Sequence, residues 1–153
     1  MKYIECRAWD ESRKEMLPIR QIIIPSGLNQ HGVQELSVSD RAFGANPSHF
    51  LVAPPIMFFI GIYDKHGVKI FSGDIVRMTE ITRDYMGQDE EDAQSVTMTG
   101  VIEFESGCFW FQAPGRSENC WFHHNSSDIE VIGNVFQNPE LSPFVTSPQR
   151  GRG

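Results

Sequence analysis

The chain has 153 residues, 20 acidic and 13 basic side chains, a formal charge of -7, and a hydrophobic content of 40%. This content is sufficient for the core of one domain or of two small β subdomains, and it excludes a disordered chain. No window approaches the roughly 20 apolar residues that span a bilayer, and no apolar signal region follows the N-terminus, so we expect a cytoplasmic protein with no membrane contact.

The N-terminal third predicts short strands and one long connection. Residues 3–9 alternate between two sides with the period of two that indicates a strand, and residues 15–17 return beside them as a hairpin. Residues 21–24 form an apolar run that fits a buried strand. Residues 28–55 are irregular and contain several Gly, Asn and Pro residues. We interpret this long connection either as a partner-binding loop or as a variable insertion.

Residues 58–76 are the stretch in which several local rules predict the same structure. Two apolar segments flank a polar turn that begins at Asp64 and ends at Gly67, which indicates a β-hairpin with Gly67 in the left-handed conformation. Gly73 and Asp74 then form a second tight turn. A β-branched strand begins directly after this turn.

The remaining segments predict further strands around turns. Residues 74–79 and 96–104 read as strands on either side of an acidic loop, residues 105–108 as a turn, and residues 109–111 as the next strand. A loop over residues 113–119, a strand over residues 120–124 and a closing strand near residues 127–134 follow. In the closing strand Gly133 is expected at a bend or close contact, with Asn134 as its neighbour in the turn.

These elements predict a mainly β fold with little helix. N-terminal and central hairpins are expected to pack on an SH3-like small barrel, an inference drawn from fold analogy that carries no functional content. The corresponding division is an N-terminal β subdomain over residues 1–71, a barrel over residues 72–141 and a flexible tail over residues 142–153.

Three stretches carry a resemblance to a known family. They are the pattern D-K-x-G-x-x-I-aromatic-x-G-D-I-V at residues 64–76, Arg-Ala-Trp-Asp at residues 7–10, and residues 131–141. In this order the chain resembles the YopX family of bacteriophage and prophage proteins, and the stretches together span nearly the whole sequence. The resemblance implies a phage- or prophage-derived protein, and it implies no defined biochemical activity.

Cysteine and histidine provide one weak set of metal ligands. Cys120, His123 and His124 lie close in sequence, and Cys108 lies a hairpin away. Adjacent histidines on a strand point to opposite faces, so only one can join Cys120, whereas a closed zinc site needs four ligands. With Cys6 the cysteines number three, which gives no disulfide framework and suits a reducing compartment. We therefore expect buried free thiols, no metal and no cofactor.

Catalytic motifs are equally weak. The sequence contains no Gly-x-Ser-x-Gly elbow and no phosphate-cradling loop. A carboxylate pair for acid and base chemistry would have to combine Asp74 with Glu103 or Glu105, but an Asp that follows Gly at a bend usually accepts hydrogen bonds from local amides. The sequence therefore predicts a protein that is not an enzyme and has no catalytic residue.

Aromatic strand residues and an acidic stretch are the candidate interaction surface. Residues 84–105 hold seven acidic residues and no Lys or Arg, and strands near residues 110 and 121 carry neighbouring aromatics that cannot all be buried on one face. The candidate contact residues are Trp110, Trp121, Asp89, Glu90, Glu91 and Asp92.

Two functions follow from this surface. One is a non-enzymatic interaction module for a host or phage protein partner, and the alternative is a single-stranded nucleic-acid-binding protein that stacks bases on aromatic side chains. The sequence shows no basic stripe of the kind that binds a phosphate backbone, so its charge does not support nucleic acid as the partner. A homo-oligomer is left open.

Overall fold

In the computed structural model the chain falls into two compact units, residues 1–59 and residues 60–153. The described residues are 5–23, 37–39, 50–52, 54–82, 94–119 and 128–144.

The first unit contains two small antiparallel groups of strands. Strand β1 (Cys6–Asp10) pairs with β2 (Glu15–Pro18) on one side and with the start of β6 (Ile56–Tyr63) on the other. The second group consists of β3 (Gln21–Ile23), β4 (Ser37–Ser39) and β5 (Phe50–Val52) in that order. Ala8, Trp9 and Met57 are buried in the first group.

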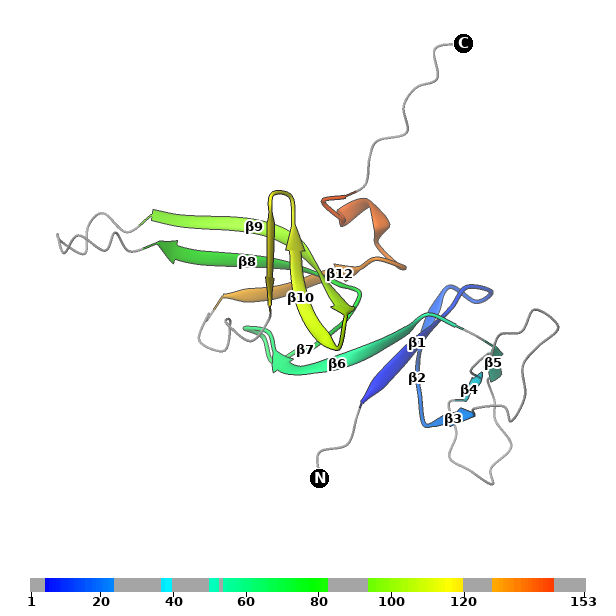
Figure 1. The fold of residues 1–153 in the computed structure, drawn as a ribbon. Helices are drawn as coiled ribbons and strands as arrows, with labels where there is room; N and C mark the ends of the chain where they lie inside the picture. The colour runs from blue at the N-terminus through cyan, green and yellow to red at the C-terminus, as the bar shows by residue number, and fades with distance from the viewer. Residues whose placement is uncertain are drawn as a thin grey trace, which may run out of the picture. The chain divides into compact units, whose positions relative to one another are not determined.

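The second unit is built on a five-stranded antiparallel sheet with the order β11-β10-β9-β8-β12. Its strands are β8 (Asp74–Thr82), β9 (Gln94–Glu105), β10 (Cys108–Ala113), β11 (Arg116–Asn119) and β12 (Ile129–Asn134). The end of β6 and strand β7 (Lys69–Phe71) form a hairpin in the same unit, and a short 3-10 helix, η3 (Pro139–Leu141), follows the sheet. Figure 1 shows the β10–β11 hairpin crossing the long β8–β9 ribbon at a steep angle, so the sheet curls into a half-barrel.

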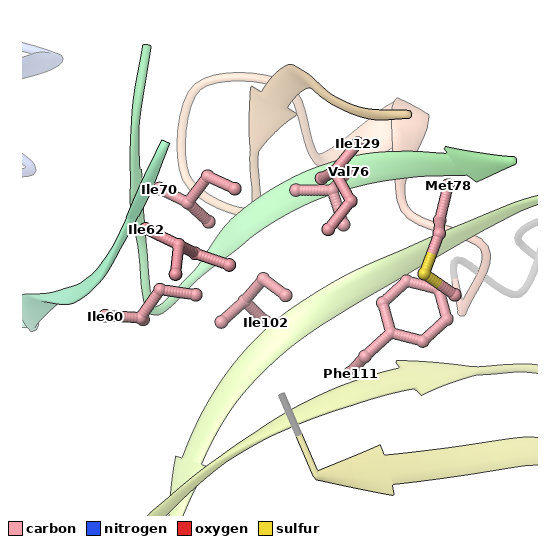
Figure 2. Close-up of a pocket in the computed structure, with 8 residues that line it drawn as sticks. All are labelled: Ile60, Ile62, Ile70, Val76, Met78, Ile102, Phe111 and Ile129. Atoms are coloured by element: carbon pink, nitrogen blue, oxygen red, sulfur yellow. The ribbon is translucent and has the colours of Figure 1, made fainter. Parts of the chain in front are cut away.

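The core of the second unit lies on the concave face of this sheet. Strand pairing places Met78 opposite Ile129 and Phe111 opposite Ile102, and all four side chains are buried. The β6–β7 hairpin adds three isoleucines to the same cluster. Figure 2 shows these side chains converging on a small apolar cavity of about 10 Å³, lined by Ile60, Ile62, Ile70, Val76, Met78, Ile102, Phe111 and Ile129.

Gly100 makes room for the largest of these side chains. A Cβ atom at this position would lie 2.4 Å from Cε2 of Phe111 and 2.6 Å from the carbonyl oxygen of Gln112. These distances are far below van der Waals contact, and the second involves backbone that cannot move aside. The ring of Phe111 therefore lies directly against the backbone of β9.

The mainly β fold predicted from the sequence is confirmed. The curled sheet is compatible with an SH3-like barrel, and that finer assignment stays a prediction, as does the subdomain division at residues 71 and 72. The loop predicted over residues 113–119 is wrong, because Pro114 and Gly115 form only a two-residue turn and Arg116–Asn119 pairs with β10. Gly115 has a φ of 75°, the conformation that a Pro-Gly turn requires.

The β8–β9 ladder also extends further than expected. The sequence placed residues 80–95 in an acidic loop, but pairing continues to Thr82 and Gln94. A cross-strand hydrogen bond of 3.0 Å between the hydroxyls of Thr79 and Thr97 supports this part of the ladder, although hydrophobic periodicity did not reveal it.

Two turn glycines generate the first prediction. Gly67 and Gly73 have φ values of 78° and 85°, in the left-handed region. Replacing either with Val forces a β-branched side chain into that region, so we expect a loss of about 1–3 kcal/mol in the free energy of unfolding, measured by urea denaturation. Gly67→Asn serves as the control and should cost less, because Asn tolerates this conformation. Equal stability of the Val variants and the wild type would contradict this account of the turns.

Candidate interaction site

Asp64 joins the central hairpin to the far edge of the sheet. Its Oδ1 accepts hydrogen bonds from the amides of His66 and Val68 at 2.8 and 2.9 Å, which closes the turn, and its Oδ2 accepts one from the amide of Val131 on β12 at 3.1 Å. Lys65 adds a backbone hydrogen bond to the carbonyl of Ile129 at 2.9 Å. Asp64 is 7% exposed, and with these hydrogen bonds it has a structural role in the turn.

The environment of Asp64 favours its charged form. Burial opposes ionisation, but the amides of Val68, Val131 and His66 donate to the carboxylate, and together with the charge of His66 they hold the pKa of Asp64 below its ordinary value.

Asp74 and Asn134 also use their side chains on the backbone. Asp74 is 1% exposed, and its Oδ2 accepts a hydrogen bond of 2.8 Å from the amide of Phe71. Asn134 accepts from the amides of Phe136 and Gln137 at 3.1 and 2.9 Å. Both side chains therefore shape the turns in which the sequence placed them.

Gly133 lies at a shift in the β12–β8 register and at a close contact. A Cβ atom there would lie 2.7 Å from Oδ1 of Asn138, and the pairing with β8 is irregular between Val131 and Gly133. The bend and the close contact, which the sequence offered as alternatives, occur together.

A charged cluster closes one end of the concave face. Arg116 of β11 makes a two-pronged ion pair with Glu80 of β8, with distances of 2.7 and 2.9 Å, and also bonds Glu118. In a flat sheet β11 and β8 would be three strand spacings apart, about 14 Å. The ion pair forms because the sheet curls, and its two carboxylates raise the pKa of Arg116 further above its ordinary value.

A second charged cluster lies beside the β6–β7 turn. Glu130 of β12 lies 3.3 Å from Nζ of Lys65, 3.4 Å from Nε2 of His66 and 3.7 Å from Nη1 of Arg77. The hydrogen bond from Lys65, followed by the charges around it, lowers the pKa of Glu130. The charges of Lys65 and Arg77 are therefore partly neutralised within the protein.

The end of the β9–β10 hairpin carries exposed aromatic and acidic side chains. Phe104 is 49% exposed and its ring centroid lies 4.9 Å from that of Phe109, its cross-strand neighbour. Trp110 pairs with Glu103, and its indole Nε1 donates a hydrogen bond of 3.3 Å to the carbonyl of Glu105. The two-residue turn of Ser106 and Gly107, with φ values of 53° and 79°, joins the strands.

Alternation assigns these side chains to opposite faces. Phe104 and Phe109 share the concave face with Phe111, whereas Trp110 shares the outer face with Glu103 and Glu105. The outer face of this hairpin end therefore combines one indole with two exposed carboxylates. We call Glu103, Glu105 and Trp110 the hairpin-end site.

The structure describes only part of the interaction surface predicted from the sequence. Trp110 lies in β10 and is half-buried. The other predicted contact residues lie outside the described residues: Trp121, Asp89, Glu90, Glu91 and Asp92. The metal-ligand candidates Cys120, His123 and His124 also lie outside them, whereas Cys108 is a half-buried free thiol.

Within the described ranges, no group of three or more His, Cys, Asp or Glu side chains is arranged to hold a metal ion. A helix long and apolar enough to cross a membrane is not found in this part of the chain. The carboxylate pair considered for acid and base chemistry combined Asp74 with Glu103 or Glu105. In the structure Asp74 is buried, whereas Glu103 and Glu105 are exposed to solvent.

Sequence reasoning missed two features of this region. The Arg116–Glu80 ion pair joins residues 36 positions apart, and no local pattern indicates it. Phe104 was assigned to a strand but not to the surface, although its place opposite Phe109 across a two-residue turn follows from strand alternation.

Comparison with known proteins identifies the family. The YopX protein family matches residues 5–142 of the chain. The chain belongs to the YopX family. None of the curated proteins compared with it is significantly similar. The family match covers all three stretches that carry the resemblance, residues 7–10, 64–76 and 131–141, and confirms it.

Two solved structures share the fold of this YopX-family chain. One is protein EF1440 from Enterococcus faecalis, with a TM-score of 0.56 and 21% identity, covering 92% of this chain and 99% of the other. The second is YopX from Bacillus subtilis, with a TM-score of 0.50 and 19% identity, covering 93% and 98%. At these identities the likeness concerns the fold alone.

Asp64 generates a prediction about pH. Asp64→Asn replaces an ionised acceptor of amide hydrogen bonds, and we expect a loss of about 1–3 kcal/mol in unfolding free energy at pH 7. Because the pKa of Asp64 is lowered in the folded state, its contribution is present above the unfolded pKa and is lost as pH falls through the folded pKa. Urea unfolding at pH 7 and near pH 3 should show the gap between variant and wild type narrowing in acid. A gap of equal size at both pH values would contradict this role, and the exposed Glu140→Gln serves as the control.

The Arg116 cluster generates a prediction about salt. Arg116→Met keeps the aliphatic stem but leaves Glu80 and Glu118 without their shared cation, so we expect a loss of about 1 kcal/mol, reduced because all three side chains are partly exposed. Added salt should shrink the difference from wild type. Arg77→Met, which removes a 50% exposed cation 3.7 Å from Glu130, is the control and should cost less. A larger loss in the control would show that the Arg116 ion pair contributes little to stability.

Proposed function

We propose that this YopX-family protein is a non-enzymatic interaction module of phage or prophage origin. In this proposal the β9–β10 hairpin and the acidic stretch before it contact a protein of the host or of the phage. The observation that carries the proposal is that aromatic side chains lie at one end of the sheet beside the exposed carboxylates of Glu103 and Glu105, which make no ion pair with another described residue.

The hydrogen bonds made by the buried polar side chains support this proposal. Among the described residues of the second unit, the buried side chains with a carboxylate or amide group are Asp64, Asp74 and Asn134, and each accepts hydrogen bonds from backbone amides. Such bonds fix these groups in turns. Their chemistry is therefore already used by the fold.

The distribution of charge supports a basic partner. Residues 84–115 contain seven acidic residues and no Lys or Arg, and this span includes all of β9 and β10. A field of one sign speeds the encounter with a partner of the opposite sign and disfavours partners of the same sign.

Single-stranded nucleic acid is the second candidate, because the exposed aromatics could stack on bases. The charges argue against it. In the described part of the second unit the Lys and Arg residues are Lys65, Lys69, Arg77 and Arg116, and carboxylates lie beside Lys65, Arg77 and Arg116. A titration with a labelled oligonucleotide at low salt tests this alternative, since saturable binding that weakens with salt would favour it.

The acidic stretch provides the test of the interaction module. The sequence predicts an exposed loop here, and exposed charges contribute little to stability, so we expect that exchanging Asp89, Glu90, Glu91 and Asp92 for Ser leaves stability almost unchanged. Association with a partner isolated from lysate should become slower and less dependent on salt, as measured by surface plasmon resonance.

The control exchanges the exposed Glu140 of η3 for Ser, which removes a charge elsewhere in the chain. An unchanged association rate and salt dependence in the fourfold variant would leave the acidic stretch with a role in solubility only.

A further inference from the structure

We propose that the hairpin-end site, Glu103, Glu105 and Trp110, is a receptor for Arg or Lys side chains on a basic segment of a protein partner. This inference rests on the proposed function and specifies the chemistry of the partner. It concerns side chains of β9 and β10 and does not involve the acidic residues at positions 84–92, which precede β9 in the sequence.

The register of the hairpin places the three side chains on one face. Trp110 is the cross-strand neighbour of Glu103, and Glu105 lies two positions further along the same strand, opposite Cys108. Residues two apart on a strand are separated by about 7 Å and point the same way. Two carboxylates therefore flank the indole on a single surface of the sheet.

The indole is held in place before any partner binds. Its Nε1 donates a hydrogen bond to the backbone carbonyl of Glu105 at 3.3 Å, which ties the ring to the strand opposite its own. A fixed ring loses little conformational freedom on binding. Trp is also the aromatic side chain whose face attracts cations most strongly, within about 6 Å of the ring centre.

Charge complementarity decides the class of partner. Between Arg83 and Arg116 the sequence has no basic residue, so neither strand of the hairpin supplies a cation of its own to these carboxylates. Arg116 bonds Glu80 and Glu118, and Arg77 lies 3.7 Å from Glu130. A cation from outside the chain meets this surface without a competitor from β9 or β10.

Arg is the better fit of the two basic residues. Its planar guanidinium stacks on aromatic faces and also donates to carboxylates in a two-pronged manner, whereas the ammonium of Lys acts as a point charge. A segment with several Arg residues would place one over Trp110 and bring others to Glu103 and Glu105. Single contacts of this kind are weak, so repetition along the segment supplies the affinity.

The opposite face of the same hairpin provides an internal control. Phe104 is 49% exposed but lies on the concave side with Phe109, away from the two carboxylates. A partner attracted only by exposed apolar surface would use Phe104. A partner that recognises a cation would depend on Trp110 instead, and Phe104→Leu should leave it unaffected.

The experiment titrates three probes into the full-length, isotope-labelled chain and follows backbone amides and indole N–H groups by NMR. The probes are a synthetic nonapeptide with three Arg residues spaced by Gly and Ser, the same peptide with Gln in place of Arg, and a single-stranded oligothymidylate. We expect the Arg peptide to shift the indole signal of Trp110 and the amides of Glu103 and Glu105, and the Gln peptide to shift none of them. Each of Glu103→Gln and Glu105→Gln should weaken binding about two- to fivefold, and Trp110→Leu about fivefold.

The outcomes separate this inference from the proposed function. Arg-peptide shifts confined to residues 84–92, with Trp110 unaffected, would overturn the receptor and leave the interaction module standing. Absence of shifts from the Arg peptide would overturn it as well, and so would equal loss of binding in Phe104→Leu. Shifts of Trp110 caused by the oligonucleotide but not by the Arg peptide would overturn both in favour of nucleic acid. An unchanged amide spectrum away from the site shows that each variant is folded.

Discussion

The buried carboxylate of Asp64 holds together two parts of the second unit that are distant in sequence. Asp64 connects three amides that belong to two distant parts of the chain, the turn at residues 66–68 and the edge strand β12. Backbone donors in a turn and at a sheet edge need acceptors once they are removed from water. Asp64 supplies these acceptors from one side chain. Its Oδ1 fixes the turn of the β6–β7 hairpin, and its Oδ2 binds a backbone amide on the edge strand β12.

The sequence predicted this region well because its determinants are local. A polar turn that ends in Gly, a following Gly-Asp pair and β-branched flanks specify the conformation of the chain within a few residues, and the φ values of Gly67 and Gly73 agree with that pattern. The long-range half of the role of Asp64 was not predictable, since Val131 is 67 positions away. The same limit applies to Arg116 and Glu80, which meet because the sheet curls. Curling results from strand twist and packing across many residues, and single-residue patterns do not encode it.

The two faces of the curled sheet have different tasks. The concave face holds the apolar cluster, with the Arg116 ion pairs at one end and the Phe104–Phe109 pair at the other. The outer face of the β9–β10 hairpin presents polar and aromatic groups that the core does not need. Because alternation separates the two sets residue by residue, the outer surface can change its chemistry while the core stays intact. This separation is consistent with a family whose fold persists at about 20% identity between this chain and its solved structural neighbours.

Gly100 has a consequence for how the strands find each other during folding. A slip of one residue between β9 and β10 would turn apolar side chains to the wrong face, but a slip of two would preserve the alternation and cost far less by that criterion. Such a slip would bring a side chain beneath the ring of Phe111, where even a single Cβ atom meets it at 2.4 Å. The lack of a side chain at Gly100 therefore favours one alignment of β9 and β10. A slip of two residues is disfavoured by a steric clash, although hydrophobic patterning alone would tolerate it.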